Sequence, residues 1–336
     1  MRVIRRRYAL FFALGMIASV PARAHVKWFA DYDLEARPRA LAEVASTPFW
    51  MLIAISLLLL WFFCHLERTR VGGALLAAID ELSAAIRGRT EDLFRSVTAA
   101  FFISLWVAGG IILTPELRTE LEFVPWLQAA IAAGMFWRAT LPLSALGILF
   151  LFILGIVRYG AFHMMDYPIF LGAAAYLAAV GLQRSPFGTP LDLARWGASI
   201  TLMWASVEKW AYPSWTFPLL RIHPTLDLGF EPSFFMTAAG VVEFALAFGL
   251  LWTPLVRRLA AIVLSGMFIS AVFAFGKIDA IGHMMIVMIL FVIAAENEPA
   301  PVRRPVLAPA YCCVALGGFI LAYYGLHALM FRSLTS

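Results

Sequence analysis

The histidines of this chain carry its clearest chemical pattern. His163 and His283 each begin the triplet His-Met-Met, with Asp166 shortly after the first and Asp279 shortly before the second. Imidazole and thioether groups together suit copper, and methionine favours the cuprous ion. We therefore consider the two histidines as candidate copper ligands, with the two aspartates as axial or supporting groups. Weaker candidates for the same site are His223, Met164 and Met284. The alternative for each histidine is a structural hydrogen bond to a loop carbonyl.

The stretch ARAHVKWF places a histidine directly after the pattern of a signal peptide. Residues 2–7 are mostly basic, residues 8–20 are apolar, and the small-x-small triplet ARA ends at Ala24. Cleavage after Ala24 makes His25 the first residue, so that its amine and its imidazole can chelate one metal ion. Such a site resembles the histidine brace of copper proteins. An uncleaved signal anchor is the alternative.

The composition predicts the elements that must position these side chains. The chain has 336 residues, of which 62% are hydrophobic and only 14% are charged. Apolar segments of about 17–22 residues are long enough to cross a bilayer, and in lipid they must be helical. The expected fold is all-α, a polytopic bundle of about ten transmembrane helices after signal cleavage. The predicted spans are 47–66, 96–113, 122–137, 139–158, 167–183, 194–212, 233–252, 258–275, 280–295 and 307–330.

The arginines orient this predicted bundle, because basic loops stay on the cytoplasmic side. A break at Arg138 divides one long apolar stretch into a hairpin, and with this break the later basic loops fall inside. Both ends of the mature chain then lie outside. This predicts a multi-pass protein of the bacterial inner membrane with a periplasmic N-terminus. Five of the six histidines fall on the outer side, and only His65 falls on the inner side.

Buried acids form a second candidate site. Glu208 and Lys209 end the sixth predicted span, and Glu243 lies near the middle of the seventh. An ionisable group within a membrane costs several kcal/mol unless it is paired, so that a functional role is the default hypothesis. Glu243 either stays neutral or pairs with Lys209 or Arg195. The three groups are candidates for handling protons or for contacting a quinone, and a structural hydrogen bond is the alternative.

Three stretches in the second half resemble the DoxX family of small membrane proteins. They are RWGASITLMWASVEKWAYP from Arg195, EFALAFGLLWTPLVRR from Glu243, and GKIDAIGHMMI. The resemblance covers about residues 190–295, and it implies a four-helix membrane unit associated with quinone or redox chemistry. The chain departs from the family in its cleavable signal, its N-terminal histidine and about six additional spans. These departures put the thiosulfate chemistry of some family members in doubt.

The sequence thus predicts four regions and leaves three functions open. The regions are a signal peptide (1–24), a periplasmic segment (25–46), a first transmembrane half (47–190) with a cytoplasmic amphipathic loop at 67–95, and a DoxX-like half (191–336). The functions are copper binding, delivery or redox chemistry; a quinone-linked oxidoreductase subunit; and a transporter or structural component. Copper, quinone and haem b are the candidate cofactors. The bilayer and a membrane or periplasmic redox partner are the expected partners. No motif for nucleotides or nucleic acids is present.

Overall fold

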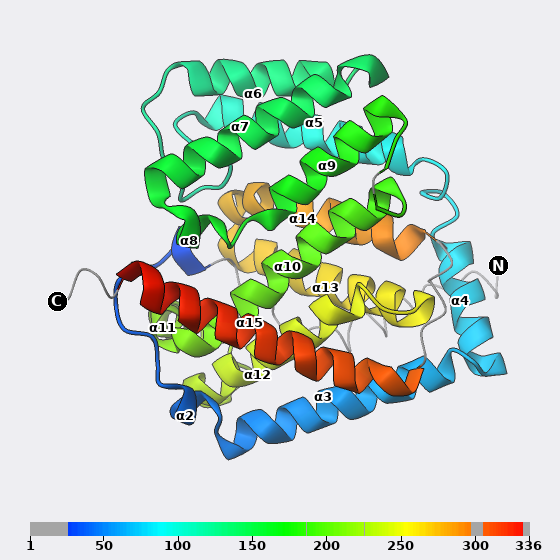
Figure 1. The fold of residues 1–336 in the computed structure, drawn as a ribbon, viewed down its shortest axis with the longest axis vertical. Coiled ribbons are helices and arrows are strands. Elements are labelled where there is room, and N and C mark those ends of the chain that lie inside the picture. The colour runs from blue at the N-terminus through cyan, green and yellow to red at the C-terminus, as the bar shows by residue number, and fades with distance from the viewer. Residues whose placement is uncertain (1–25, 186, 225, 297–304, 332–336) are drawn as a thin grey trace.

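A computed structural model describes residues 26–185, 187–224, 226–296 and 305–331 (Figure 1). This part of the chain is helical apart from turns, loops and one isolated bridge between Ile111 and Arg118, which confirms the all-α prediction. The long helices are α3 (Thr47–Leu66), α4 (Arg70–Leu82), α5 (Thr90–Ala108), α6 (Phe123–Gly134), α7 (Leu141–Tyr159), α9 (Pro168–Leu182), α10 (Pro190–Ala211), α12 (Pro232–Gly249), α13 (Pro254–Phe275), α14 (Lys277–Ala295) and α15 (Ala308–Phe331). The short ones are η1 (Val26–Trp28), α2 (Leu41–Val44), η2 (Arg138–Thr140), α8 (Ala161–Met164), η3 (Pro213–Thr216), α11 (Phe217–Ile222) and η4 (Pro305–Leu307).

Six helices in the described part are long and apolar enough to cross a bilayer. They are α3, α7 together with η2, α12, α13, α14 and α15. The chain is therefore a multi-pass membrane protein by length and composition. Of the other predicted spans, α6 and α9 are apolar but shorter, while α5 and α10 carry more charged residues. Ten crossings stay a prediction, although a helix lies at each of the ten predicted segments.

The hairpin at Arg138 is present in the structure. Helix α6 ends at Gly134, η2 makes the turn, and α7 returns along α6. Pro142 at the start of α7 explains the break, since its ring removes a backbone donor that only the first helical turn can spare.

The predicted amphipathic loop at 67–95 also contains the expected helix, which is α4. The Thr69 side chain begins α4 by accepting a hydrogen bond from the Gly72 amide at 3.2 Å.

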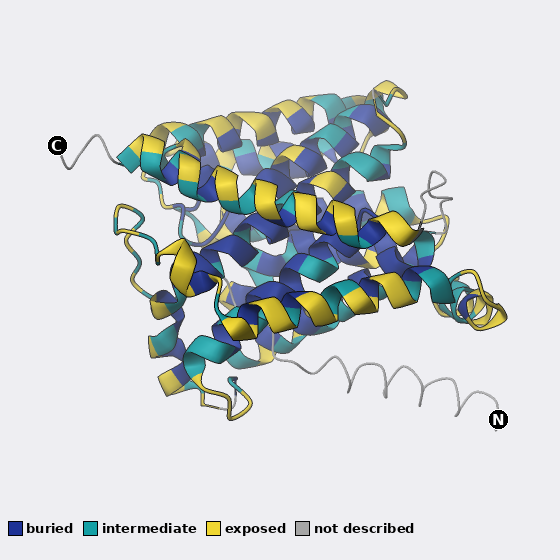
Figure 2. Cartoon of the chain, turned by 60° about the horizontal axis from the view of Figure 1, so that its bottom comes forward, coloured by how far each residue is buried: buried dark blue, intermediate teal, exposed yellow. Residues whose placement is uncertain are grey.

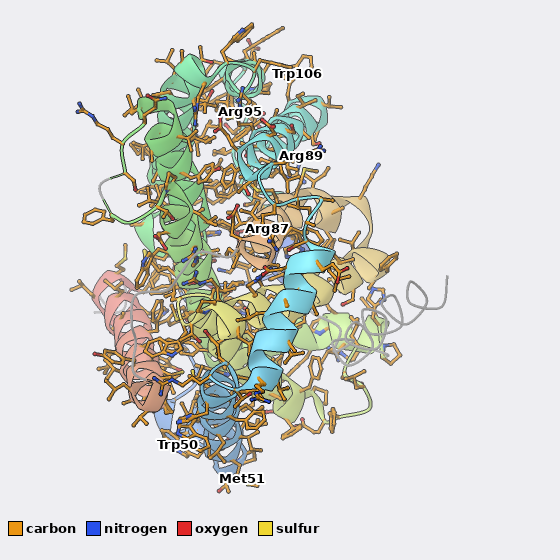
Figure 3. The ribbon with its side chains drawn as sticks, turned by 90° about the vertical axis from the view of Figure 1, so that its right-hand side faces the viewer. Trp50, Met51, Arg87, Arg89, Arg95 and Trp106 are labelled. Carbon is orange, nitrogen blue, oxygen red and sulfur yellow. The ribbon has the colours of Figure 1, made fainter. Side chains whose placement is uncertain are left out.

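The loops predicted to share a side of the membrane lie together in space. On the predicted outer side, His327 near the end of α15 lies 2.9 Å from the Leu34 carbonyl. On the predicted inner side, Arg258 of α13 donates to Asp80 of α4 at 2.6 Å. In Figure 1 the outer elements α2, α8 and α11 lie at the left and α4 lies at the right. Figure 3 views the molecule from the inner side and labels the basic residues Arg87, Arg89 and Arg95 there.

Helices α9 and α10 form the centre of the bundle. Helix α10 packs against α9, α12, α14 and α15, whereas α3 and α15 turn exposed stripes outward (Figure 2). Gly172 of α9 and Gly197 of α10 meet where these two helices cross, so that their backbones approach closely. The Thr201 hydroxyl of α10 then accepts from the Ile169 amide at 2.8 Å, which satisfies a donor in the first turn of α9.

The close crossing of α9 and α10 gives a first prediction. In a Gly197→Ala variant the new methyl group would lie 2.8 Å from the Gly172 Cα atom and 2.9 Å from the Pro168 carbonyl oxygen, so the helices must separate. We expect destabilisation of about 1–3 kcal/mol, measured as a lower midpoint of thermal unfolding in detergent. The control is Gly317→Ala on α15, where a methyl group meets no atom within 4 Å. Equal midpoints for the two variants would contradict this account of the crossing.

Candidate functional site

The first described residues form a strap across the predicted outer ends of the helices, and we use this name for residues 26–40. Figure 1 shows the blue beginning of the strap beside α8. The side chain of Lys27 is fully buried, and its Nζ lies 2.5 Å from Asp166 Oδ2 and 2.6 Å from Glu208 Oε2. Asp166 lies between α8 and α9, and Glu208 is in the last turn of α10. The strap therefore inserts an ammonium group between two helix ends.

The carboxylates keep Lys27 charged despite its burial. Burial by itself lowers the pKa of the ammonium group, but Asp166 and Glu208 outweigh it and hold the pKa above the ordinary lysine value. The rings of Tyr32 and Trp215 lie 5.5 Å and 5.6 Å from the same Nζ, within the range of a cation–π interaction. Carboxylates and aromatic rings together thus form an ammonium-binding pocket that the chain's own lysine occupies.

A buried cluster of possible metal ligands adjoins Lys27. His163 on α8 lies with its Nε2 2.8 Å from Oε1 of Glu116, a residue of the connection between α5 and α6. The Tyr167 hydroxyl donates to the same oxygen. Among the described residues, one ligand atom each from Glu116, His163 and Asp166 lie within 4.8 Å of one another. One imidazole nitrogen and two carboxylate oxygens form a donor set that suits zinc, copper or iron.

The structure divides the predicted ligands into two groups. His163 and Asp166 belong to the cluster with Glu116, whereas His283 and Asp279 form a separate pair on α14. His283 Nδ1 lies 3.1 Å from Asp279 Oδ2, and the His283 ring is flanked by Trp28 and Phe268, each with a ring centroid 4.8 Å away.

The residues considered as weaker candidates for metal ligands have packing roles. The Met164 thioether packs against Gly155 of α7, where it fills the space that a side chain would take. Met284 is partly buried against the hydrophobic core, and the His223 ring packs edge-on against Phe275 at 5.2 Å. His25 lies outside the described residues, so that the predicted brace stays a prediction.

The acids predicted to handle protons or a quinone are all ion-paired. Lys209 Nζ lies 2.8 Å from Glu243 Oε1, so Glu243 uses the first of the two partners considered for it. Arg195 pairs with Asp192 on its own helix at 2.6 Å. Glu208 and Lys209 are adjacent in α10 and do not pair with each other, because neighbouring residues on a helix point in different directions.

A small, partly open cavity connects these groups. Its volume is about 90 Å³, and its polar lining includes Asp166, Glu208, Lys209, Glu243 and His283. Aromatic side chains complete the wall, namely Trp28, Tyr167, Phe170, Tyr212, Trp215 and Phe268. The cavity therefore lies directly beneath the strap, and Asp166 belongs to both the metal-ligand cluster and the cavity wall.

Comparison of the chain with protein-family models, curated proteins and solved structures found no match. The resemblance to the DoxX family therefore stays an expectation from the residues between 190 and 295.

The buried ammonium group gives a second prediction. In a Lys27→Met variant the positive charge between Asp166 and Glu208 is lost, and the two carboxylates repel each other in a non-aqueous setting. We expect destabilisation of about 3–5 kcal/mol, seen as a lower unfolding midpoint or a lower yield of folded protein. The control is Lys277→Met, because Lys277 is exposed. Adding Glu208→Gln to the Lys27 variant should restore part of the loss, and no restoration would argue against a charge effect.

Proposed function

We propose that this multi-pass membrane protein binds a transition-metal ion on its outer face, with copper as the first candidate. The observation that supports the proposal is the convergence of Glu116, His163 and Asp166 within 4.8 Å. Metal–ligand bonds of about 2.0–2.2 Å place neighbouring ligand atoms roughly 3–4.4 Å apart. A small contraction of the cluster is enough to accept an ion.

The charges around the cluster favour a divalent cation. Three buried or half-buried carboxylates, those of Glu116, Asp166 and Glu208, surround the single ammonium group of Lys27. With a neutral imidazole, two negative charges are left over in a region of low dielectric constant, where uncompensated charge is expensive. Lys27 contacts Oδ2 of Asp166, so a metal ion would share this carboxylate with the lysine as a bridging ligand.

The strap supports copper in particular, because it leads back to the predicted N-terminal histidine. His25 stands two positions before Lys27 in the chain, a reach of about 7 Å between their Cα atoms at most. After signal cleavage the amine and imidazole of His25 would add two nitrogen ligands to the cluster. A nitrogen-rich donor set favours copper over the other divalent ions.

The proposal includes the arrangement in the cell that the sequence predicts. Ten helices cross the bacterial inner membrane, the strap faces the periplasm, and the site exchanges copper or electrons with a membrane or periplasmic partner. In this arrangement the DoxX-like half supplies Glu208 of α10, which pairs with Lys27 beside the cluster. The strap supplies Lys27, and the first half supplies the three ligands Glu116, His163 and Asp166.

Metal analysis of the purified protein gives a third prediction. After reconstitution with copper and removal of excess, we expect about one equivalent per chain, with at least about a tenfold loss of affinity in His163→Ala and Glu116→Gln, since a removed ligand or a ligand's partner typically costs that much. The control is His65→Ala, whose Nδ1 lies 2.8 Å from the Trp61 carbonyl on the other side of the bundle. Wild-type protein that retains no copper, zinc or iron would refute the metal site.

The predicted histidine brace gives a fourth prediction, and its outcome is independent of the outcome for the cluster with His163. Mass spectrometry of the mature protein should show a chain that starts at His25, and His25→Ala should weaken copper binding while leaving the His163-dependent site able to hold zinc. A mature chain that retains residues 1–24, or a His25→Ala variant with unchanged copper affinity, would remove the brace from the proposal and leave the cluster.

A further inference from the structure

Three acceptor atoms of buried side chains on the wall of the cavity have no hydrogen-bond donor among the described residues. Glu208 uses Oε2 for Lys27, and Glu243 uses Oε1 for Lys209, which leaves the other oxygen of each carboxylate without a donor. Both residues are more than nine-tenths buried, at 5% and 6% exposure. His283 is equally buried, and its Nδ1 lies 3.1 Å from Asp279 Oδ2 without forming a hydrogen bond. In the tautomer that carries the proton on Nδ1, Nε2 of His283 is the third acceptor.

The charges around the cavity leave room for one more positive charge. Five carboxylates serve the cavity and the adjoining cluster, and they are those of Glu116, Asp166, Glu208, Glu243 and Asp279. Lys27 and Lys209 neutralise two of them. With both imidazoles neutral, negative charge is left over whether or not a metal ion occupies the cluster, and in a membrane bundle it calls for a cation or a proton.

Residues beside the cavity already bind one ammonium group, which belongs to the chain itself. On the strap side, Asp166 and Glu208 bind the primary ammonium group of Lys27 under the rings of Tyr32 and Trp215. Trp215 also lines the cavity, together with Trp28, Tyr212 and Phe268. Carboxylate oxygens for the N–H donors and aromatic faces for the positive charge are the chemistry by which proteins bind ammonium ions.

The size of the cavity limits its ligand. A cavity of about 150 Å³ holds a benzene ring, whereas this cavity measures about 90 Å³. This space favours a small ion such as ammonium or methylammonium over a larger organic cation.

We propose that the cavity is a binding site for a small primary ammonium ion, either ammonium itself or methylammonium, held by Glu208, Glu243 and His283. The ion donates N–H bonds to the three acceptors, and a methyl group would face the aromatic wall. This site goes beyond the proposed metal function and does not depend on it, because its acceptors are separate from Glu116 and His163.

Ligand-dependent stability of the full-length protein in detergent tests this proposal. Unfolding midpoints are measured against increasing ammonium, methylammonium, sodium and tetramethylammonium chloride at constant ionic strength. We expect a saturable rise with the first two salts and none with tetramethylammonium, which has no N–H group to donate to the acceptors. Equal shifts with all four salts, or with sodium alone, would overturn the assignment of an ammonium site. Metal content is measured on the same samples, so that failure of one site is distinguished from failure of the other.

Two variants localise the effect. Ala205 lines the cavity, and Ala205→Leu fills it without changing any charge, so the ammonium-dependent rise should be lost. Its matched control is Ala133→Leu on α6, an exposed position away from the cavity, where the rise should be unchanged. Glu243→Gln should raise the half-saturating ammonium concentration by about tenfold, since a charged hydrogen bond becomes a neutral one. An unchanged rise in both Ala205→Leu and Glu243→Gln would refute the site.

Discussion

The structure depends on one buried ion cluster, in which the Lys27 ammonium lies between the carboxylates of Asp166 and Glu208. Desolvating these charges is expensive, and the arrangement is favourable only while all three groups stay together. The lysine comes from the strap, one acid comes from the connection before α9, and the other comes from the end of α10. The ion cluster therefore joins the N-terminal segment to the central helix pair, and it sets where everything else on the outer side must lie.

The central helix pair makes this possible by approaching closely. Gly172 and Gly197 remove the side chains at the crossing of α9 and α10, and the Thr201 hydroxyl satisfies a backbone donor at the start of α9. These contacts hold Asp166 and Glu208 at a distance that one ammonium group can bridge. The same carboxylates then have surfaces on two sides, toward the cluster with Glu116 and toward the cavity.

The histidine pattern predicted two residues of the cluster and missed the residues that surround them. His163 and Asp166, three residues apart, do meet in one cluster, because the turn that follows α8 brings Asp166 back beside His163, with the Asp166 amide 3.2 Å from the His163 carbonyl. Glu116 completes the cluster, but it lies in an irregular connection, TPELR, that has no periodicity to mark it. Lys27 was not among the predicted site residues, although it is the most deeply enclosed cation of the strap. A lysine next to Trp and Phe is also typical of a segment at the membrane interface, and only packing distinguishes the two settings.

By itself the sequence determined the helical class, the positions of the helices, the hairpin at Arg138 and the grouping of loops on two sides. These features follow from the length of the apolar segments and from the positions of the prolines and arginines. Both act locally or through the bilayer. Tertiary structure alone decided which ionisable groups meet: Lys27 with Asp166 and Glu208, Lys209 with Glu243, and His163 with Glu116. The reason is physical. Partners 34 to 181 residues apart in the chain are selected by how helices pack, and buried charge tolerates few other pairings.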